Sequence, residues 1–279
     1  QAQRQIGFSL GVVHINHQLR EESAEEAAYL RSYCEKKNLP LYVSVWEDPA
    51  KTAIETAARN FRYQAFTRVM EEEQYDTLMT AHHGDDQIET VLMKIIRGGQ
   101  LSTFSGIKEV QPFATGRLVR PLLSFSKEEL YAYAAESQLV YFEDQTNQLL
   151  DVQRNRLRHL VVPQLKQENT QVMRHFQQFS QQIQWADQVI QKCMGQLIEK
   201  EVEQLKDRFQ FSAEMIEKME EAERYYFFHS FFDKVFSETG VILKEQQMTS
   251  ILEQWQQKKS QWQLSIGSNW VLKREYHFV

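Results

Sequence analysis

The feature that most constrains the fold is a short apolar run, residues 75–79, that leads through a polar turn into an amphipathic stretch ending at Arg97. This order predicts a buried strand, a tight turn and a helix. Strand-like runs followed by helical stretches also occur twice earlier in the chain. Because such alternation builds βαβ units, we predict an α/β fold with a doubly wound parallel sheet. The predicted strand and helix pairs are residues 10–15 with 22–37, 41–46 with 52–72, and 75–81 with 85–97.

The sequence changes character after Pro163, where glutamine becomes frequent. From Phe176 to Ile190 apolar residues recur at intervals of three and four, which predicts a long amphipathic helix. Two strand-like runs surround a glycine-containing turn within residues 262–276 and predict a hairpin. We therefore expect two domains: an α/β domain over residues 1–165, and a smaller, mainly helical domain with a C-terminal hairpin over residues 166–279.

Charge and cysteine content restrict the class of protein. The net charge of −6 speaks against a broad nucleic-acid-binding face, but a basic track over residues 91–127 and a basic knot at residues 154–159 could each hold a polyanion. The two cysteines lie far apart, which argues against a disulfide framework, a zinc site or an iron–sulfur cluster. No apolar run approaches the roughly 18 residues of a membrane span. We expect a cytoplasmic protein without membrane contact.

The polar turn concentrates titratable groups where ligands of α/β proteins bind. It carries His82, His83, Asp85 and Asp86, and Glu89 follows one helical turn later. Two neighbouring carboxylates repel each other unless a cation, a substrate amine or a phosphate-bound metal accompanies them. A plain helix cap is the alternative, but a cap needs only one carboxylate. We therefore interpret this turn as a catalytic site, with Asp85 and Asp86 as candidate metal ligands.

Other polar clusters are weaker signals. Asn16, His17 and Arg20 follow the first predicted strand and suit a nucleotide or phosphate, although a histidine at a strand end is often structural. Glu55, Arg59 and Arg62 share one face of a predicted helix, where an exposed ion pair is the plain alternative. Arg97 precedes Gly98 and Gly99 and could reach a phosphate or offset the helix dipole. No single cluster of these is decisive.

Together these clusters resemble one family, the tRNA(Ile)-lysidine synthetases of the PP-loop (N-type) ATP pyrophosphatase superfamily. The resemblance extends over essentially the whole chain, and its motifs occur in the family's order. They are His14-Ile-Asn-His-Gln-Leu-Arg20, Glu55-x3-Arg59-x2-Arg62-Tyr63, Ala81-His-His-x-Asp-Asp-Gln-x-Glu-Thr90, Arg97-Gly98, Ser105-Gly106-Ile107, Arg120-Pro121-Leu122-Leu123, and Asp144-x-Thr146-Asn147 followed by Arg154-Asn155-x-Leu157-Arg158.

One part of the family pattern is not in this sequence. The family's phosphate loop, Ser-Gly-Gly-x-Asp-Ser, follows its first strand, and residues 1–5 resemble the end of the helix after that loop. Because the backbone amides of such a loop hold the pyrophosphate of ATP, we expect the sequence to be truncated or to omit residues there. The family's further C-terminal domain is also not seen.

The resemblance implies a tRNA-modifying ligase that uses ATP and Mg²⁺. Its substrates would be free L-lysine and the wobble cytidine of tRNA(Ile) with the anticodon CAU. ATP adenylates the C2 oxygen of that base, and the lysine amine then displaces AMP to give lysidine. A homodimer is compatible with the sequence. The candidate residues are, for catalysis, His82, His83, Asp85, Asp86 and Glu89; for the cofactor, Asn16, His17, Arg20 and Arg97; and for substrate, Glu55, Arg59, Arg62, Tyr63, Arg120, Asn147, Arg154, Asn155 and Arg158.

Two alternatives stay open. Another PP-loop tRNA-modifying enzyme is one, although thiolases normally carry cysteine pairs and glutamine amidotransferases carry a cysteine-nucleophile domain. A non-catalytic RNA-binding module is the other. For the second domain we expect tRNA contacts outside the anticodon, with Lys258, Lys259, Lys273 and Arg274 as candidate phosphate ligands.

Overall fold

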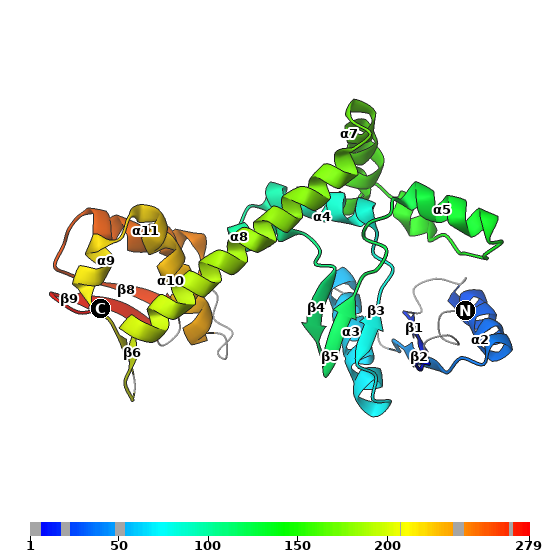
Figure 1. Cartoon of the computed structure of the whole chain (residues 1–279), viewed down its shortest axis with the longest axis horizontal. Helices are drawn as coiled ribbons and strands as arrows, with labels where there is room; N and C mark the ends of the chain where they lie inside the picture. Colours follow the sequence, from blue (N-terminus) through cyan, green and yellow to red (C-terminus); the bar gives the residue numbers. More distant parts are fainter. Residues whose placement is uncertain (1–6, 18–22, 48–53, 207, 237–242, 268–269) are drawn as a thin grey trace. The chain divides into compact units, whose positions relative to one another are not determined.

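The computed structural model describes residues 7–17, 23–47, 54–206, 208–236, 243–267 and 270–279, with the side chain of residue 145 excepted. The chain divides into two compact units (Figure 1). The first contains residues 1–93 and 106–177, and the second contains residues 94–105 and 178–279. Arg20 lies outside the described residues.

The first unit contains two small sheets rather than one. Strands β1 and β2 pair in parallel, and strand β3 pairs in parallel with β5, as the alternating pattern predicted. Strand β4, which is not among the strands predicted above, pairs antiparallel with β5. A single doubly wound sheet is therefore not formed among the described strands. The strands are β1 (Val12–Asn16), β2 (Leu41–Val45), β3 (Thr77–Met79), β4 (Val110–Phe113) and β5 (Gly116–Val119).

A groove of about 720 Å³ separates the two sheets. Residues of β1 and β3 line it, together with Phe66 and Met70 of helix α3 (Ile54–Glu72). Both sheets pack on this helix: Val13 and Ile15 of β1 and Leu78 of β3 belong to one apolar cluster with Phe66. The sheets thus share a core although no hydrogen-bonded strand joins them among the described residues (Figure 1).

Helices place the polar turn at the carboxyl end of β3. Helix α4 begins at Gly84, directly after the turn, and a helical run from Gln153 to Glu168 packs beside it through Ile88 and Val162. This run contains a π turn over Leu157–Val161, where the Val162 amide donates to the Leu157 carbonyl. Pro163, which has no N–H to donate, follows at once. The elements are α2 (Ser23–Lys37), α4 (Gly84–Arg97), η1 (Leu101–Ser105), α5 (Lys127–Glu136), η2 (Gln145–Gln148), α6 (Gln153–Arg156), η3 (Leu157–Val161) and α7 (Val162–Glu168).

The second unit is helical with an aromatic core. Phe227 and Phe228 have no exposed surface, and Ile216, Met248 and Ile251 pack in the same cluster. The predicted hairpin is present as β8 and β9, with its turn residues 268–269 outside the described part. No described helix combines the length and apolarity that a membrane crossing requires. The elements are α8 (Val172–Glu201, which begins in the first unit), β6 (Glu203–Gln204), β7 (Phe209–Gln210), α9 (Ala213–Lys218), α10 (Glu221–Phe236), α11 (Glu245–Gln256), β8 (Gln261–Gly267) and β9 (Trp270–Glu275).

Candidate active site

The start of α4 is fixed by close packing. The Gly84 amide donates to the Phe125 carbonyl at 2.8 Å. A Cβ atom at residue 84 would collide with the side chain of Met173 and lie 3.1 Å from the Phe125 carbonyl oxygen, so any larger residue would require Met173 to move. The Gln87 side chain, 3 % exposed, accepts the Ile107 N–H at 2.6 Å and so ties the helix to the following loop. Packing and backbone hydrogen bonds therefore hold the turn independently of its charged groups.

Asp85 joins three helices. Its Oδ1 pairs with Lys166 Nζ at 2.5 Å, and its Oδ2 accepts the Lys127 N–H at the first residue of α5 at 2.7 Å. Lys166 also pairs with Glu128, at 2.9 Å. These bonds use Asp85 to connect α4, α5 and α7, which favours a structural role for a residue that the sequence suggested as catalytic.

Asp86 and Glu89 form a second carboxylate group, held by two arginines. Arg154 donates to Asp86 Oδ1 at 2.8 Å and to Glu89 Oε2 at 2.6 Å. Arg158 donates to both oxygens of Glu89, at 2.7 and 3.0 Å. Glu89 has no exposed surface, whereas the Arg154 side chain is 31 % exposed. A buried carboxylate is thus balanced by guanidinium groups, one of which is open to solvent.

The two histidines of the turn lie beside Asp86. His82 Nδ1 is 2.9 Å from Thr80 Oγ1, and burial lowers the pKa of His82 to about 4 although Asp86 acts in the opposite direction. The His82 ring is therefore neutral at pH 7. His83 Nε2 is 3.5 Å from Asp86 Oδ2, and the His83 amide donates to the same oxygen at 3.0 Å. The structure thus brings His82, His83, Asp86 and Glu89 together.

The cation that the paired carboxylates require comes from the chain itself. Lys166, Arg154 and Arg158 neutralise Asp85, Asp86 and Glu89, so no external ion is needed to stabilise the turn. Within the described part of the chain, no group of three or more His, Cys, Asp or Glu side chains is arranged to hold a metal ion. The sequence pattern did not single out Lys166, which lies in a stretch without a distinguishing motif.

A small pocket of about 170 Å³ lies at the carboxyl end of β1. His14, Asn16 and His17 form one side of it, and Asp144 and Thr146 form another. Nitrogen atoms His14 Nε2 and His17 Nδ1 are buried without a hydrogen-bond partner among the described residues. Burial lowers the pKa of both rings. The predicted cofactor residues Asn16 and His17 therefore line a polar pocket.

The predicted residues of α3 lie near that edge. Arg62 Nη2 is 3.4 Å from His17 Nε2, and the Arg59 guanidinium lies 5.0 Å from the centre of the Tyr63 ring. Glu55 is exposed, and no ion pair with Arg59 is found in the described structure. The α3 face is consequently a surface of cationic and aromatic groups rather than an ion-paired one.

Three other predicted substrate residues have structural partners. Arg120 is 5 % exposed and donates to the Lys108 carbonyl at 2.6 Å. Asn155, 7 % exposed, donates to two carbonyls, and Asn147 accepts from Arg158 at 3.2 Å. Arg97 ends α4, exposed, about three turns from the carboxylates. Direct substrate contact is therefore not favoured for Arg120 and Asn155, and Arg97 does not belong to the carboxylate site.

Comparison with known proteins shows which proteins this chain is similar to. Residues 1–165 match the PP-loop domain family. The chain is 44 % identical over 274 residues to the tRNA(Ile)-lysidine synthase of Enterococcus faecalis, which covers 98 % of this chain and 59 % of that protein. It is 51 % identical over 174 residues to the synthase of Lactiplantibacillus plantarum, covering 62 % of this chain and 39 % of that protein.

A solved structure shares the fold. The U34-tRNA thiolase NcsA from Methanococcus maripaludis, solved with its [4Fe-4S] cluster, superposes with a TM-score of 0.52 at 16 % identity, over 63 % of each chain. Fold and matched family together define an α/β protein of the PP-loop class. Within that class, the chain belongs to the tRNA(Ile)-lysidine synthase family. It spans 59 % of the length of the E. faecalis relative.

Proposed function

We propose that this chain carries out tRNA(Ile)-lysidine synthesis. In this reaction the C2 oxygen of the wobble cytidine in tRNA(Ile) with anticodon CAU is adenylated by ATP, which releases pyrophosphate. The amine of lysine then attacks C2 and displaces AMP. The observation that carries the proposal is the Asp86–Glu89 carboxylate pair. Both carboxylates are buried, and the Arg154 side chain that pairs with them is partly exposed to solvent. Identity to lysidine synthases over nearly the whole chain supports it.

The carboxylate pair would recognise the cationic substrate. Arg154 bridges Asp86 and Glu89 with two hydrogen bonds. An alkyl ammonium presents donors of the same kind, so the ammonium of L-lysine could replace this guanidinium without leaving either carboxylate buried and unpaired. His82 is neutral at pH 7 and offers hydrogen bonds beside the site without adding repulsion to a cationic substrate.

The pocket beside β1 fits part of a nucleotide. His14 Nε2 and His17 Nδ1, which have no hydrogen-bond partner among the residues that the structure describes, provide hydrogen-bonding groups at the carboxyl edge of a parallel strand, where α/β folds bind ligands. ATP would supply the activating adenylyl group. The Mg²⁺ site predicted at Asp85 and Asp86 does not fit, because Lys166 and Arg154 already occupy these carboxylates and no third donor joins them among the described residues.

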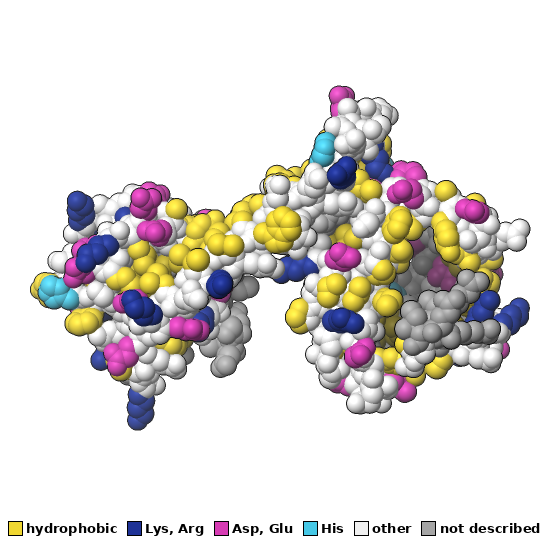
Figure 2. All heavy atoms as spheres, in the orientation of Figure 1, with side chains coloured by type: hydrophobic (Ala, Val, Ile, Leu, Met, Phe, Trp, Pro, Cys, Tyr) yellow, Lys and Arg dark blue, Asp and Glu magenta, His cyan; other side chains and the backbone are white. Residues whose placement is uncertain are grey.

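Contacts to the tRNA are part of the same proposal. In the second unit, Lys258 and Lys259 are exposed and remain candidate phosphate ligands. Figure 2 shows basic side chains mixed with acidic ones over the visible face of this unit, so contacts would be local. Arg274 is not a candidate, because it is 5 % exposed, pairs with Glu217 and lies over the Trp255 ring.

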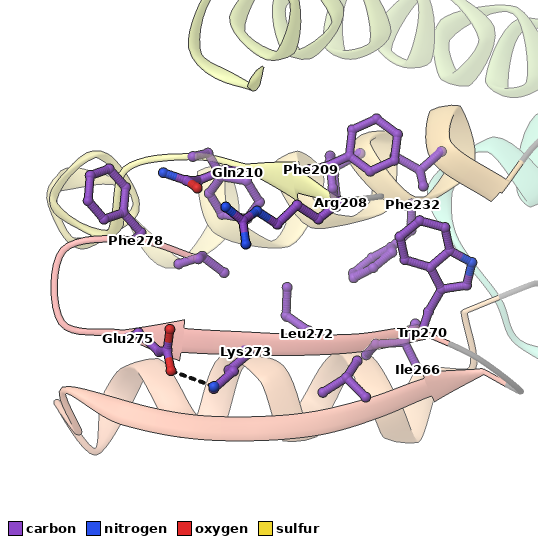
Figure 3. A pocket seen from close by; sticks show the side chains of 15 residues that line it. Arg208, Phe209, Gln210, Phe232, Ile266, Trp270, Leu272, Lys273, Glu275 and Phe278 are labelled. Carbon is purple, nitrogen blue, oxygen red and sulfur yellow. Dashed lines mark ion pairs between the residues drawn. The ribbon is translucent and has the colours of Figure 1, made fainter. Parts of the chain in front are cut away.

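A cavity of about 550 Å³ in the second unit has a lining that suits a nucleobase. Trp270 and Phe209 lie at one end of it, and Arg208 contributes a cation, whereas Lys273 pairs with Glu275 of the same lining (Figure 3). Aromatic rings beside cationic groups are the usual means of holding unstacked bases. A cytoplasmic location, where tRNA is modified, follows from the proposed reaction.

The test is tRNA-dependent incorporation of labelled lysine. We expect Asp86→Asn to abolish incorporation, while Glu128→Gln, which alters an exposed carboxylate 70 % open to solvent, leaves it nearly unchanged. Protein that binds tRNA but never incorporates lysine, under conditions where a known lysidine synthase does, would instead support an RNA-binding module.

A further inference from the structure

A helical segment, residues 153–161, contacts two sites with two adjacent faces. Arg154 and Arg158, four residues apart, reach the carboxylates Asp86 and Glu89. Asn155 and His159, again four residues apart, reach the turn η2. Residues at this spacing lie one above the other on a helix, so each pair forms its own stripe. Arg158 also donates to the side-chain oxygen of Asn147 in η2, at 3.2 Å. The segment therefore holds the carboxylate group with the first pair, and it holds the backbone of the turn with the second.

The turn η2 is held mainly through its backbone. Asn155 donates to the Thr146 carbonyl within the turn at 3.0 Å and to the carbonyl of Leu149, the residue after it, at 2.8 Å. His159 Nε2 is 2.8 Å from the Asn147 carbonyl oxygen. Because Asn155 is buried, its two hydrogen bonds satisfy carbonyl groups that would otherwise need water as a donor. The position of η2 thus depends on where the segment 153–161 sits.

The opposite side of η2 forms a wall of the pocket beside β1. Asp144 caps the turn by accepting from the Thr146 amide at 2.9 Å, and both residues line the pocket together with His14 and His17. A displacement of η2 would change the width of this pocket directly. The carboxylate group and the pocket are consequently separated by only one helical segment and one turn.

We propose that Asn155 and His159 are positioning residues that couple the two sites. The inference rests on the proposed function, in which the cationic substrate binds at Asp86 and Glu89 and the nucleotide binds at the β1 pocket. A cation entering the carboxylate site competes with Arg154 and Arg158, which hold the segment in place. The hydrogen bonds from Asn155 and His159 to η2 then weaken, and the affinity of the pocket for the nucleotide falls. Coupling of this kind is reciprocal.

The experiment measures the Kd of a non-hydrolysable ATP analogue for the purified full chain by calorimetry, without and with saturating L-lysine. We expect lysine to raise this Kd about fivefold, within the usual range of allosteric coupling. In His159→Ala the ratio should fall toward one, because only the Asn155 and Arg158 bonds to this turn remain, while the Kd for lysine alone stays unchanged because the ion pairs at Glu89 are intact. His159→Gln, whose amide can donate to the Asn147 carbonyl, should restore the coupling.

Arg156→Ala is the matched control. Arg156 belongs to the same segment but donates to the carbonyls of Leu150 and Asp151, outside η2, so this variant should keep the full ratio. A ratio of one or less in the unsubstituted chain, or an unchanged ratio in His159→Ala, would overturn the inference. If lysine binds without affecting the nucleotide, only the coupling is wrong. If lysine does not bind at all, the proposed function fails and the coupling fails with it.

Discussion

Arg158 donates to both carboxylate oxygens of Glu89, at 2.7 and 3.0 Å, while Glu89 itself has no surface exposed to solvent. A carboxylate so deeply buried is tolerated only where cationic groups remain beside it. The Arg158 side chain is 20 % exposed and so supplies this charge from the edge of the core. The site therefore combines a buried anion with cations that are partly exposed to solvent.

Removing the Glu89 charge should destabilise the first unit strongly. Glu89→Gln leaves Arg154 and Arg158 with only Asp86, and breaking a buried ion pair costs about 3 kcal/mol. Glu128→Gln alters an exposed pair and should cost less than about 1 kcal/mol. Urea unfolding followed by circular dichroism measures both. Equal losses in the two variants would show that the burial of Glu89 does not determine its contribution.

Asp85 should contribute to stability in two ways, by accepting the Lys127 N–H hydrogen bond and by its charge. Asp85→Asn loses the ion pair with Lys166 but keeps an oxygen for the Lys127 N–H, whereas Asp85→Ala loses both interactions. We expect the alanine variant to be less stable by about 1 kcal/mol, the usual contribution of a side-chain cap at a helix start. Amide exchange at Lys127 should be faster in Asp85→Ala alone. Identical exchange in the two variants would contradict the cap.

Gly106 should tolerate substitution less well than Gly98. Both have positive φ, +67° and +74°, so alanine at either position costs about 1 kcal/mol in backbone strain. At Gly106 a Cβ would also lie 2.7 Å from the Gln87 amide group, whereas nothing lies within 4 Å at Gly98. Thermal unfolding of Gly106→Ala and Gly98→Ala provides the comparison. A Gly98 variant that is as unstable as the Gly106 variant would refute the role given to Gln87.

Stability should fall on acidification because of His82. The folded pKa of about 4 is below the usual 6.5, so the unfolded chain takes up the proton first. The contribution of this residue to folding is complete above pH 6.5 and is lost progressively as the pH falls toward 4. His82→Asn, which can still bond Thr80, should unfold with a shallower pH dependence over this window. His14, His17 and His229, whose pKa values burial also lowers, would account for the slope that remains.

Neutral substitutions of Lys258 and Lys259 should weaken tRNA binding without affecting the fold. Both side chains are exposed, and abolishing a phosphate interaction should reduce the log–log salt slope by up to about one. Binding titrations at several salt concentrations measure the affinity and the slope together. Arg274→Gln should instead lower the unfolding temperature, because Arg274 is buried between Glu217 and Trp255. If neither the affinity nor the slope changes in the lysine variants, the second unit does not bind tRNA through these residues.

The sequence predicted local elements well because each depends on nearby residues. The helix after the polar turn, predicted at 85–97, is found at Gly84–Arg97, and the C-terminal hairpin is present. Strand β4 was missed, since Pro112 and the surrounding glycines are typical of loops. Whether parallel pairs join into one sheet depends on contacts between distant segments. The local pattern carried no information on the groove between β1 and β3.

For the candidate site, sequence predicted which acids gather but not what balances them. Clustered carboxylates at a strand end indicated a cation, and we expected it to be a ligand or metal. In the structure these carboxylates pair with Arg154, Arg158 and Lys166, which lie more than sixty residues further along the chain. Charge compensation across such a separation depends on tertiary packing, so the roles of Asp85 and Asn155 became apparent only in the fold.

The π turn before Pro163 sets the direction in which Lys166 points. In an uninterrupted α-helix, which turns by roughly 100° per residue, Lys166 would lie about 80° around the axis from Arg158. The π turn contains one extra residue, which reduces the rotation between Arg158 and Lys166 by about 100°. The side chains of Arg158 and Lys166 therefore both face α4, and Lys166 pairs with Asp85. The π turn thus sets the helix face on which Lys166 lies. Deleting the exposed Leu160 should convert it to plain α-helix and keep Lys166 on Asp85, whereas inserting a residue there should rotate Lys166 away without changing any charged side chain.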